Sequence, residues 1–520
     1  NNVDWKQEVD RLNRISKMTK AEIVSFANRF FDNGYAAVYK VQGTDTTIQK
    51  VDKPKITPIP TNNDKHSAFL QEIVNHQVEP IKPVFVDFKK DLTKSTTKKG
   101  WPILYKQNTQ DDLFTLYLEI PFGKESDLLP GYAKMYIDYL GTDKMTNAQI
   151  KQELYKLACD YDIGQTDDET YFKLTGLNEN LPKALALIND VIDNAKVDKE
   201  AYAAAVDLLI KSQKDKKADQ KSNFRALQDY GMYGAYNSTR NILSEEQLKN
   251  MDPQKLLNSL KGLKNYKQTV LYYGPSSLKD IDNLLSKTFK TAKKFTPLPK
   301  EKRYTLQTTP KNEILIAPYD AKNIYMVQFH NENKEWNPND AAKIAVFNEY
   351  FGGGMNAIVF QEMREARALA YSASASYRTP SRLGDKEYFN TYIITQNDKM
   401  MDCVAQFNEL LNNVPVRQAN FDLAKQNLLK SLASARTTKF SILAAYMAAQ
   451  KMGLDYSLSE KIYKDLPSVT LDDIINFEKT NMANKTFKYL ILGDEKELDM
   501  KALEKIAPIK RVTTEEIFGY

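Results

Sequence analysis

The stretch Phe351-Gly352-Gly353-Gly354-Met355-Asn356 decides how this chain is organised. Its three consecutive glycines separate two segments with apolar periodicity, so the backbone there must bend sharply or let another group approach closely. Asn356 then offers a helix N-cap, and apolar residues recur at helical spacing from Ile358 onward. The pattern predicts a helix that ends near Leu369.

Two polar side chains follow the glycines on consecutive elements. Arg364 lies on the predicted helix, and Tyr371 begins an alternating segment, up to Tyr377, that predicts a strand. We expect an extended peptide to bind here, with Arg364 and Tyr371 as the chemical groups. The backbone of Gly352, Gly353, Gly354 and Met355 should contact the peptide, which could also pair along a strand edge.

Length and composition limit the function classes. The chain has 520 residues, too many for one core, and three or four domains are expected. It is 42% hydrophobic and 27% charged, as soluble globular proteins are. The net charge of +6 is small for this length and no compact basic motif occurs, so nucleic acid is not an expected partner. No apolar run is long enough to span a bilayer. Cys159 and Cys403 lie in helical patterns and are expected to be buried thiols.

An internal repeat sets the domain organisation. A Thr or Asp N-cap precedes an amphipathic helix, then an asparagine, and then an apolar strand that ends at glycine. The three copies span Thr19–Gly43, Asp252–Gly274 and Thr470–Gly493. Their final glycines are separated by 274 − 43 = 231 and 493 − 274 = 219 residues. The chain therefore contains two complete units, preceded by the tail of a third.

The repeat predicts five segments. They are 1–43, the C-terminal tail of a preceding homologous domain; 44–83, a proline-rich linker; 84–275, a first full unit; 276–299, a connector; and 300–520, a second full unit. The tail ends in a predicted strand, Tyr35–Val41, and carries Ile23 and Phe26 on one side of its helix. Such a piece cannot bury its apolar face alone.

Each full unit begins with strands and continues with paired helices. In the first unit the strands are expected at Val84–Phe88, Trp101–Tyr105, Phe114–Pro121 and Tyr171–Leu177, and in the second at Ile314–Ala317, Ile324–His330 and Phe389–Gln396. This order predicts an α+β fold of two homologous units, each an antiparallel sheet with helices packed on one face.

Three short motifs in the second unit resemble those of a known protein family. Phe351-Gly-Gly-Gly-Met, followed by Phe360-Gln-Glu-Met-Arg and Leu369-Ala-Tyr-Ser, is similar to a motif of insulinase/pitrilysin-like zinc metallopeptidases. The resemblance implies four homologous α+β domains in two halves that close around a peptide. Residues 1–43, 84–275 and 300–520 would then be the end of domain two and domains three and four. The one departure is that Ala368 and Ala370 flank Leu369, where a glycine often stands.

The family's zinc motif, His-x-x-Glu-His, is absent from this chain. Its three histidines, His66, His76 and His330, lie outside such a motif. On the homologous helix of the first unit, Lys134 stands where the first histidine would be, Ile137 where the glutamate would be, and Asp138 where the second histidine would be. A lysine ammonium cannot bind zinc at neutral pH, so no metal ligand is expected in this chain. The resemblance places zinc in an N-terminal catalytic half, the expected partner.

The resemblance also assigns a role to Arg364 and Tyr371. In fused members of the family, an arginine and a tyrosine seven residues later reach across the closed enzyme, and 371 − 364 = 7 here. A guanidinium and a phenol can both donate to the scissile carbonyl and to the oxyanion that forms from it.

Other interpretations stay open. The glycines alone are typical of a plain turn, and no Gly-Lys-Ser/Thr follows to make a phosphate loop. The lysines from Lys211 to Lys221 are typical of a solvated helix, or of a basic chamber wall that attracts acidic peptides. The chain could also be a non-catalytic scaffold or peptide-binding subunit of a larger complex. Family habit alone favours the bacterial periplasm or cell envelope.

Overall fold

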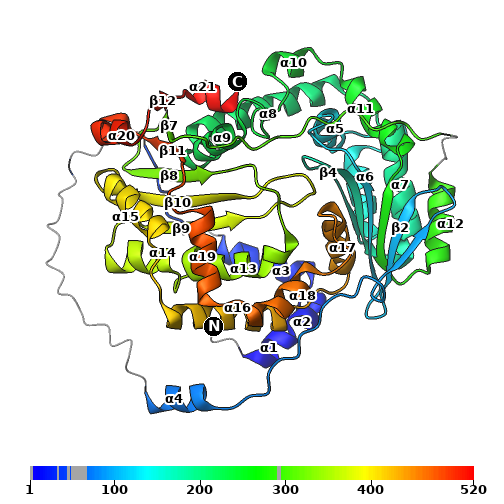
Figure 1. The fold of residues 1–520 in the computed structure, drawn as a ribbon. Helices are drawn as coiled ribbons and strands as arrows, with labels where there is room; N and C mark the ends of the chain where they lie inside the picture. The colour runs from blue at the N-terminus through cyan, green and yellow to red at the C-terminus, as the bar shows by residue number, and fades with distance from the viewer. Residues whose placement is uncertain (1–3, 32–33, 42, 44–46, 48–66, 290–293) are drawn as a thin grey trace. The chain divides into compact units, whose positions relative to one another are not determined.

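The computed structural model describes residues 4–31, 34–41, 43, 47, 67–289 and 294–520, and it divides into two compact units (Figure 1). The smaller unit is Asn1–Val78 and the larger is Glu79–Tyr520.

The smaller unit consists of short helices with exposed apolar side chains. They are α1 (Trp5–Val9), α2 (Arg11–Lys17), α3 (Lys20–Phe30) and α4 (Ala68–Asn75). The repeat's helix is confirmed in α3, where Thr19 is the N-cap and forms a reciprocal capping box with Glu22. Its apolar side chains are not covered: Ile23 is 58% exposed and Phe26 52%.

The strand predicted at Tyr35–Val41 is not formed. Tyr35–Val41 is extended and exposed, and it belongs to no strand of the sheets among the described residues. A strand needs a neighbour for its backbone hydrogen bonds, and the described part of the smaller unit contains no other strand.

The larger unit contains two lobes, each built on one sheet of six strands. The first lobe's sheet has the order β1-β2-β6-β3-β5-β4. Its elements are β1 (Thr93–Thr96), β2 (Pro102–Gln107), β3 (Leu113–Ile120), α5 (Leu129–Ile137), α6 (Asn147–Lys156), β4 (Cys159–Gln165), β5 (Thr170–Leu177), α7 (Leu181–Asn194), α8 (Lys199–Ala218), α10 (Glu245–Asn250), α11 (Pro253–Gly262), β6 (Thr269–Gly274) and α12 (Leu278–Thr288). Helix α12 lies within the predicted connector, yet its Ile281 and Leu285 belong to the first lobe's core.

The second lobe repeats this plan with the strand order β12-β7-β11-β8-β10-β9. Its elements are β7 (Glu313–Pro318), β8 (Asn323–His330), α13 (Ala341–Phe347), α14 (Ile358–Phe360), β9 (Ser372–Arg378), β10 (Tyr388–Gln396), α15 (Met400–Asn412), α16 (Gln418–Ser434), α18 (Leu458–Asp465), α19 (Leu471–Asn481), β11 (Lys488–Gly493), α20 (Met500–Ile506), β12 (Ile509–Arg511) and α21 (Thr514–Phe518). Two homologous α+β units are thus confirmed.

The sheets are mixed, which corrects the prediction of wholly antiparallel sheets. The repeat's strand lies inside each sheet: β6 pairs parallel with β2 and antiparallel with β3. Likewise β11 pairs parallel with β7 and antiparallel with β8. Parallel neighbours need a long connection between them. The repeat's strand comes from the end of its unit, so the helices of the unit lie in that connection and the strand can pair parallel with the first one.

The two lobes exchange a helix, so helices cover both faces of each sheet. Helix α9 (Gln220–Tyr233) follows the first lobe's α8 but packs on the second sheet, where the Cβ of an alanine in place of Gly231 would lie 2.3 Å from a methyl carbon of Leu490. Helix α17 (Ser441–Lys451) of the second lobe packs on the first sheet in return (Figure 1). The prediction that helices pack on only one face of each sheet was therefore incomplete.

The strand predicted at Val84–Phe88 is wrong, and the helix exchange explains why. Val86 and Phe88 are buried in the cluster that α17 makes with the first sheet, without strand pairing. An apolar run can be buried by a helix as well as by a sheet, so its composition alone did not distinguish the two.

Ion pairs also join the lobes. Arg382 of the second lobe donates hydrogen bonds from its two terminal guanidinium nitrogens to Glu125 of the first, at 2.5 and 2.8 Å, and the Glu125 side chain has no exposed area. Lys451, at the end of α17, lies 3.0 Å from Asp168 and 3.9 Å from Glu119. Burial and the nearby Glu169 charge raise the pKa of Glu119 to about 7. Buried charges that are paired in this way position the lobes against each other.

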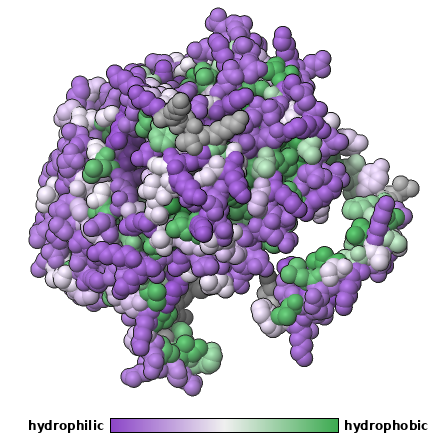
Figure 2. All heavy atoms as spheres, turned by 90° about the vertical axis from the view of Figure 1, so that its right-hand side faces the viewer, coloured by the Kyte–Doolittle hydropathy of each residue, from purple (hydrophilic) through white to green (hydrophobic). Residues whose placement is uncertain are grey.

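The surface and the cysteines match the composition. The face seen in Figure 2 is mainly hydrophilic, with small hydrophobic patches. Cys159 and Cys403 are both free and buried, as expected. Among the described residues, none of the helices combines the length and the apolarity that a membrane crossing requires.

One buried carboxyl should make stability depend on pH. Glu478 of α19 is 1% exposed, and neither carboxyl oxygen has a hydrogen-bond partner among the described residues. Burial raises its pKa from 4.5 to about 7. The folded state therefore holds this proton more tightly than the unfolded state. The resulting stability is complete below pH 4.5 and is lost as the pH rises to about 7.

We expect Glu478→Gln to abolish this loss. The variant's free energy of unfolding should equal that of the wild type at about pH 4 and exceed it by up to about 3 kcal/mol at about pH 8. Denaturant titrations at both pH values measure the difference, with the exposed Glu504→Gln as a control that should change neither. Equal stabilities of Glu478→Gln and wild type at both pH values would contradict the argument.

Candidate functional site

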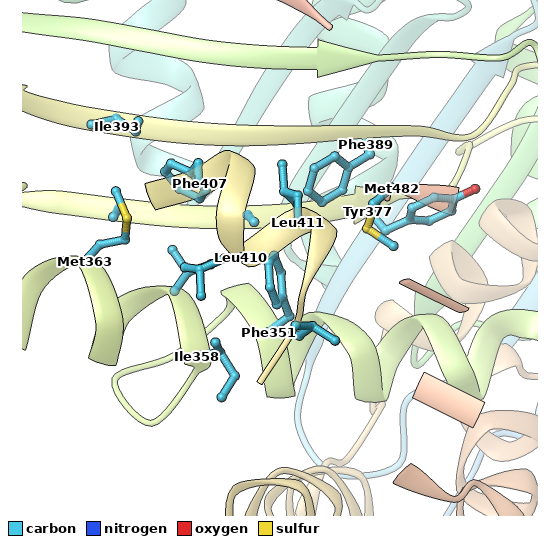
Figure 3. Close-up of a cluster of buried hydrophobic side chains, with 14 of the residues drawn as sticks. Phe351, Ile358, Met363, Tyr377, Phe389, Ile393, Phe407, Leu410, Leu411 and Met482 are labelled. Atoms are coloured by element: carbon cyan, nitrogen blue, oxygen red, sulfur yellow. The ribbon is translucent and has the colours of Figure 1, made fainter. Parts of the chain in front are cut away.

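The glycine stretch ends a helix that is packed against the edge strand β9. Helix α13 continues into a π-helical turn, Asn348–Gly352, in which Phe351 is fully buried. Figure 3 shows Phe351 directed toward Leu410 and Leu411 of α15. Gly352 is buried, and a Cβ there would lie 2.0 Å from the carbonyl oxygen of Ala375 in β9. Close approach of helix and strand therefore requires this glycine.

The same turn closes part of the exposed edge of β9. The Asn348 side chain accepts a hydrogen bond from the Tyr377 backbone N–H at 2.8 Å and donates one to its carbonyl at 3.0 Å. These are the groups that an added strand would use. A peptide therefore cannot pair with β9 at Tyr377, which limits the expected edge pairing to the other end of the strand.

The rest of the glycine loop is more open. Gly353 is exposed, Gly354 is half-buried, and Met355 is 71% exposed. The N-cap of the next helix, α14, is Ala357, so the prediction for Asn356 is wrong. The Asn356 carbonyl instead accepts a hydrogen bond from the Asn420 side chain.

Arg364 and Tyr371 lie close to each other after the glycine loop, on either side of the turn that leads into β9. Arg364 belongs to a second π-helical turn, Gln361–Ala366, and such turns are frequent at functional sites. Its guanidinium carbon lies 4.9 Å from the centre of the Phe360 ring and 6.0 Å from that of Tyr371. Tyr371 is 79% exposed, and its hydroxyl has no hydrogen-bond partner among the described residues. Both groups are thus available to a ligand.

Ala368 occupies a backbone conformation that favours glycine. Its φ is +49°, in the left-handed region that L-residues with a Cβ rarely adopt. Lys399 donates a hydrogen bond to its carbonyl at 2.9 Å, and its own N–H donates to the Arg364 carbonyl at 3.1 Å. The departure noted in the sequence therefore marks a strained turn, held by its neighbours, between Arg364 and Tyr371.

A charge cluster beneath Arg364 has no signal in the sequence. The two carboxyl oxygens of Glu362 bind Arg367 and Arg417. Burial opposes ionisation of Glu362, but hydrogen bonds from Arg417 and Arg367 outweigh it and lower the pKa. Because Arg417 lies 417 − 362 = 55 residues away, only the fold brings these groups together.

The comparison with protein families agrees with this architecture. Residues 103–240 match the insulinase family (peptidase family M16), and residues 265–428 match the peptidase M16 inactive domain. The chain belongs to the insulinase family of peptidases. The two matches lie on the first lobe and on the start of the second, as the internal repeat requires.

Individual relatives are distant. The chain is 24% identical over 383 residues to an uncharacterized zinc protease of Rickettsia felis, covering 68% of this chain and 83% of the relative. The periplasmic protease PqqL of Escherichia coli has the same fold, with a TM-score of 0.62, 14% identity, and coverage of 93% of this chain and 52% of PqqL. A chain of Complex III2 from Candida albicans also matches, with a TM-score of 0.55, 13% identity, and coverage of 80% and 100%.

The first lobe's counterpart of the family's zinc helix, α5, does not fit a zinc ion. The Lys134 ammonium lies 2.6 Å from Asp138 and 3.6 Å from Asp162 of β4, and Asp138 also accepts a hydrogen bond from Tyr161. Burial opposes the lysine charge, but the bond and charge of Asp138 outweigh it and raise the pKa of Lys134. An internal cation thus neutralises these carboxylates. No cluster of three His, Cys, Asp or Glu that could hold a metal occurs among the described residues.

A cavity of about 430 Å³ lies between the lobes, away from Arg364 and Tyr371. Its walls are the loop after β4, the loop between β9 and β10, and part of α9. Acidic and basic side chains line it in equal number: Asp167, Asp168, Asp229 and Asp385 face Arg225, Arg303, Arg382 and Lys386. No charge dominates, so the cavity does not favour an ionic ligand of either sign.

The packing of the glycine stretch leads to a prediction about stability. Gly352→Ala should destabilise the protein by about 1–3 kcal/mol or more, because its Cβ meets the β9 backbone, which cannot move freely. Gly354→Ala is the matched control: the nearest atom to its Cβ is a Glu349 carboxyl oxygen at 3.9 Å, so the change should stay within about 0.5 kcal/mol. Denaturant titration compares the two, and equal effects would contradict this account.

A second prediction concerns metal. The purified chain should contain far less than one zinc per molecule, because Lys134 holds the carboxylates of the α5 site. Elemental analysis after dialysis measures this. One tightly bound zinc per chain that survives mild chelation would show that the ligand assignment is wrong.

Proposed function

We propose that this chain is the C-terminal, non-zinc-binding half of a zinc-dependent endopeptidase. It closes over a peptide substrate and supplies Arg364 and Tyr371 to a zinc site carried by an N-terminal half. The observation that carries the proposal is the position of these two side chains: adjacent, exposed, and held on a rigid frame.

The frame suits electrostatic stabilisation. A guanidinium and a phenolic hydroxyl donate hydrogen bonds, and their effect on a developing oxyanion is largest when they are already in place. Gly352 packs against β9, Asn348 holds the Tyr377 backbone, and the Ala368 turn links Arg364 to Tyr371. The exposed Gly353 and Met355 offer the substrate backbone and side-chain contacts on the same side of the lobe.

The comparisons support a half-enzyme. This chain spans about half of PqqL, which is described as a periplasmic protease, while 93% of this chain is matched. The Rickettsia felis relative is described as a zinc protease. Since the α5 site of this chain holds a lysine, the zinc of the proposed enzyme must belong to the other half.

A non-catalytic scaffold is the second candidate. It is favoured by the match to the peptidase M16 inactive domain and by the similarity to a chain of Complex III2. Arg364 and Tyr371 would then contact a partner protein without chemistry. A His-x-x-Glu-His motif in coding sequence upstream of Asn1 would favour the enzyme, and a search there costs little.

Tyr371→Phe tests the proposal in the enzyme reconstituted with its zinc-binding half. We expect kcat to fall about 100- to 1000-fold, as is typical when one oxyanion donor is lost, with KM nearly unchanged. The thermal midpoint should hardly move, because the hydroxyl is exposed and makes no hydrogen bond to a described residue. Arg364→Ala should lower kcat by a similar factor.

Matched controls separate chemistry from general effects. Tyr155→Phe removes another exposed hydroxyl, since Tyr155 is 85% exposed on α6, and Arg378→Ala removes an exposed arginine from the far end of β9. Both should leave kcat unchanged. If Tyr371→Phe retains full turnover, Tyr371 is not a catalytic residue, and the scaffold function gains support.

A further inference from the structure

We propose that the cavity between the lobes binds a neutral, hydroxyl-rich ligand of the size of a mono- or disaccharide. Its volume of about 430 Å³ lies within the range of small-molecule sites. The proposal does not rest on the proposed function, because the described residues that line the cavity do not include Arg364 or Tyr371. Both lobes contribute to the walls, so a ligand there would contact both.

Two tyrosines line the cavity with hydroxyls that are not used in the fold. Tyr233 is the last residue of α9, and Tyr388 is the first residue of β10. Both side chains are half-buried, yet neither hydroxyl has a hydrogen-bond partner among the described residues. Burial raises the pKa of both phenols, so each stays protonated and can donate as well as accept. Such groups gain most from a ligand that offers hydrogen-bonding partners.

The charged side chains of the cavity neutralise one another at close range. Arg225 donates to Asp229 at 3.2 Å, and Arg382 donates to Asp385 at 3.0 Å. Positive and negative groups are therefore intermixed on the walls and do not form the two separate poles that a zwitterion would need. An ionic ligand would have to break such a pair and leave a charge without its partner. A ligand without charge avoids this penalty.

The same walls retain hydrogen-bonding capacity of both kinds. Arg225 binds Asp229 through Nε, and its two terminal nitrogens have no partner among the described residues. Asp167 accepts from the Ser238 hydroxyl through Oδ1 at 3.2 Å, while its Oδ2 has no partner in the described part of the chain. Donors and acceptors side by side suit neighbouring hydroxyls, each of which both donates and accepts. Saccharides carry such hydroxyls on adjacent carbons, and tyrosine rings offer faces on which a sugar ring can pack.

Titration calorimetry of the whole chain tests the proposal with three neutral probes: glucose, N-acetylglucosamine and trehalose. We expect at least one of them to bind one-to-one, with a Kd in the roughly millimolar range that ligands of this size reach. Because the probe is neutral, the Kd should change less than about 2-fold between roughly 0.05 and 0.5 M NaCl. Glycylglycine, a zwitterion, and inorganic phosphate should bind at least about 10-fold more weakly, since each would disturb the ion pairs.

Tyr233→Phe and Tyr388→Phe each remove one hydroxyl and keep the ring, so both variants should fold. Each should weaken binding of the tightest probe about 5- to 30-fold, because a bound hydroxyl loses its partner. Tyr392→Phe is the matched control. Tyr392 is a half-buried tyrosine of the same strand as Tyr388, its hydroxyl has no partner among the described residues, and it does not line the cavity. Its substitution should leave binding unchanged.

Each outcome decides the proposal. Binding of a saccharide that is weakened by either cavity substitution but not by Tyr392→Phe supports it. No binding of any of the three probes at their highest soluble concentration would overturn it. So would binding that is indifferent to both cavity substitutions, or tighter binding of glycylglycine or phosphate than of every saccharide. None of these measurements uses peptidase turnover, so this proposal and the role of Tyr371 fail separately.

Discussion

The exchange of α9 and α17 is the interaction on which the larger unit depends. Each sheet has two apolar faces, and on one of them a helix from the other lobe contributes to the cover. Leu490 and Leu492 of β11 are buried in a cluster with α9 of the other lobe and with Ile517 and Phe518 of α21, and Leu271 of β6 is buried in a cluster with α17. The Glu125–Arg382 pair is buried at the same junction. Neither lobe is therefore a complete folding unit, although each has its own sheet.

The candidate site shows how one residue type can serve two purposes. Of the three glycines, Gly352 allows a helix to touch a strand, while Gly353 and Gly354 leave a surface open. The close contact gives rigidity, and the open part gives access. Asn348 also holds the β9 backbone by a hydrogen bond, and Arg364 and Tyr371 are already close to each other. The local structure therefore need not change when a peptide binds. Donors that are already in place lose little conformational entropy when a ligand binds.

Much of the fold could be predicted from the sequence, because the repeat's N-caps, helical periodicity and final glycines are local signals. The positions of Arg364 and Tyr371 on consecutive elements were predicted for the same reason. What the sequence could not predict depends on distant contacts. These are the helix exchange, the burial of Val86 and Phe88 without a strand, and the clamp of Glu362 by Arg417. The N-cap at Asn356 failed because an asparagine after glycines also suits a turn, and the backbone took that alternative.

The helix exchange also has a consequence for synthesis. The first lobe's strands and helices are complete at Thr288, but α17, which covers its second face, ends at Lys451, 451 − 288 = 163 residues later. At roughly 5–20 residues per second, the ribosome needs about 8–30 s to deliver it. During that time the apolar faces of both the first sheet and α9 have no partner. The nascent chain must then rely on a chaperone, or on transient pairing of these two surfaces with each other, until the second lobe emerges.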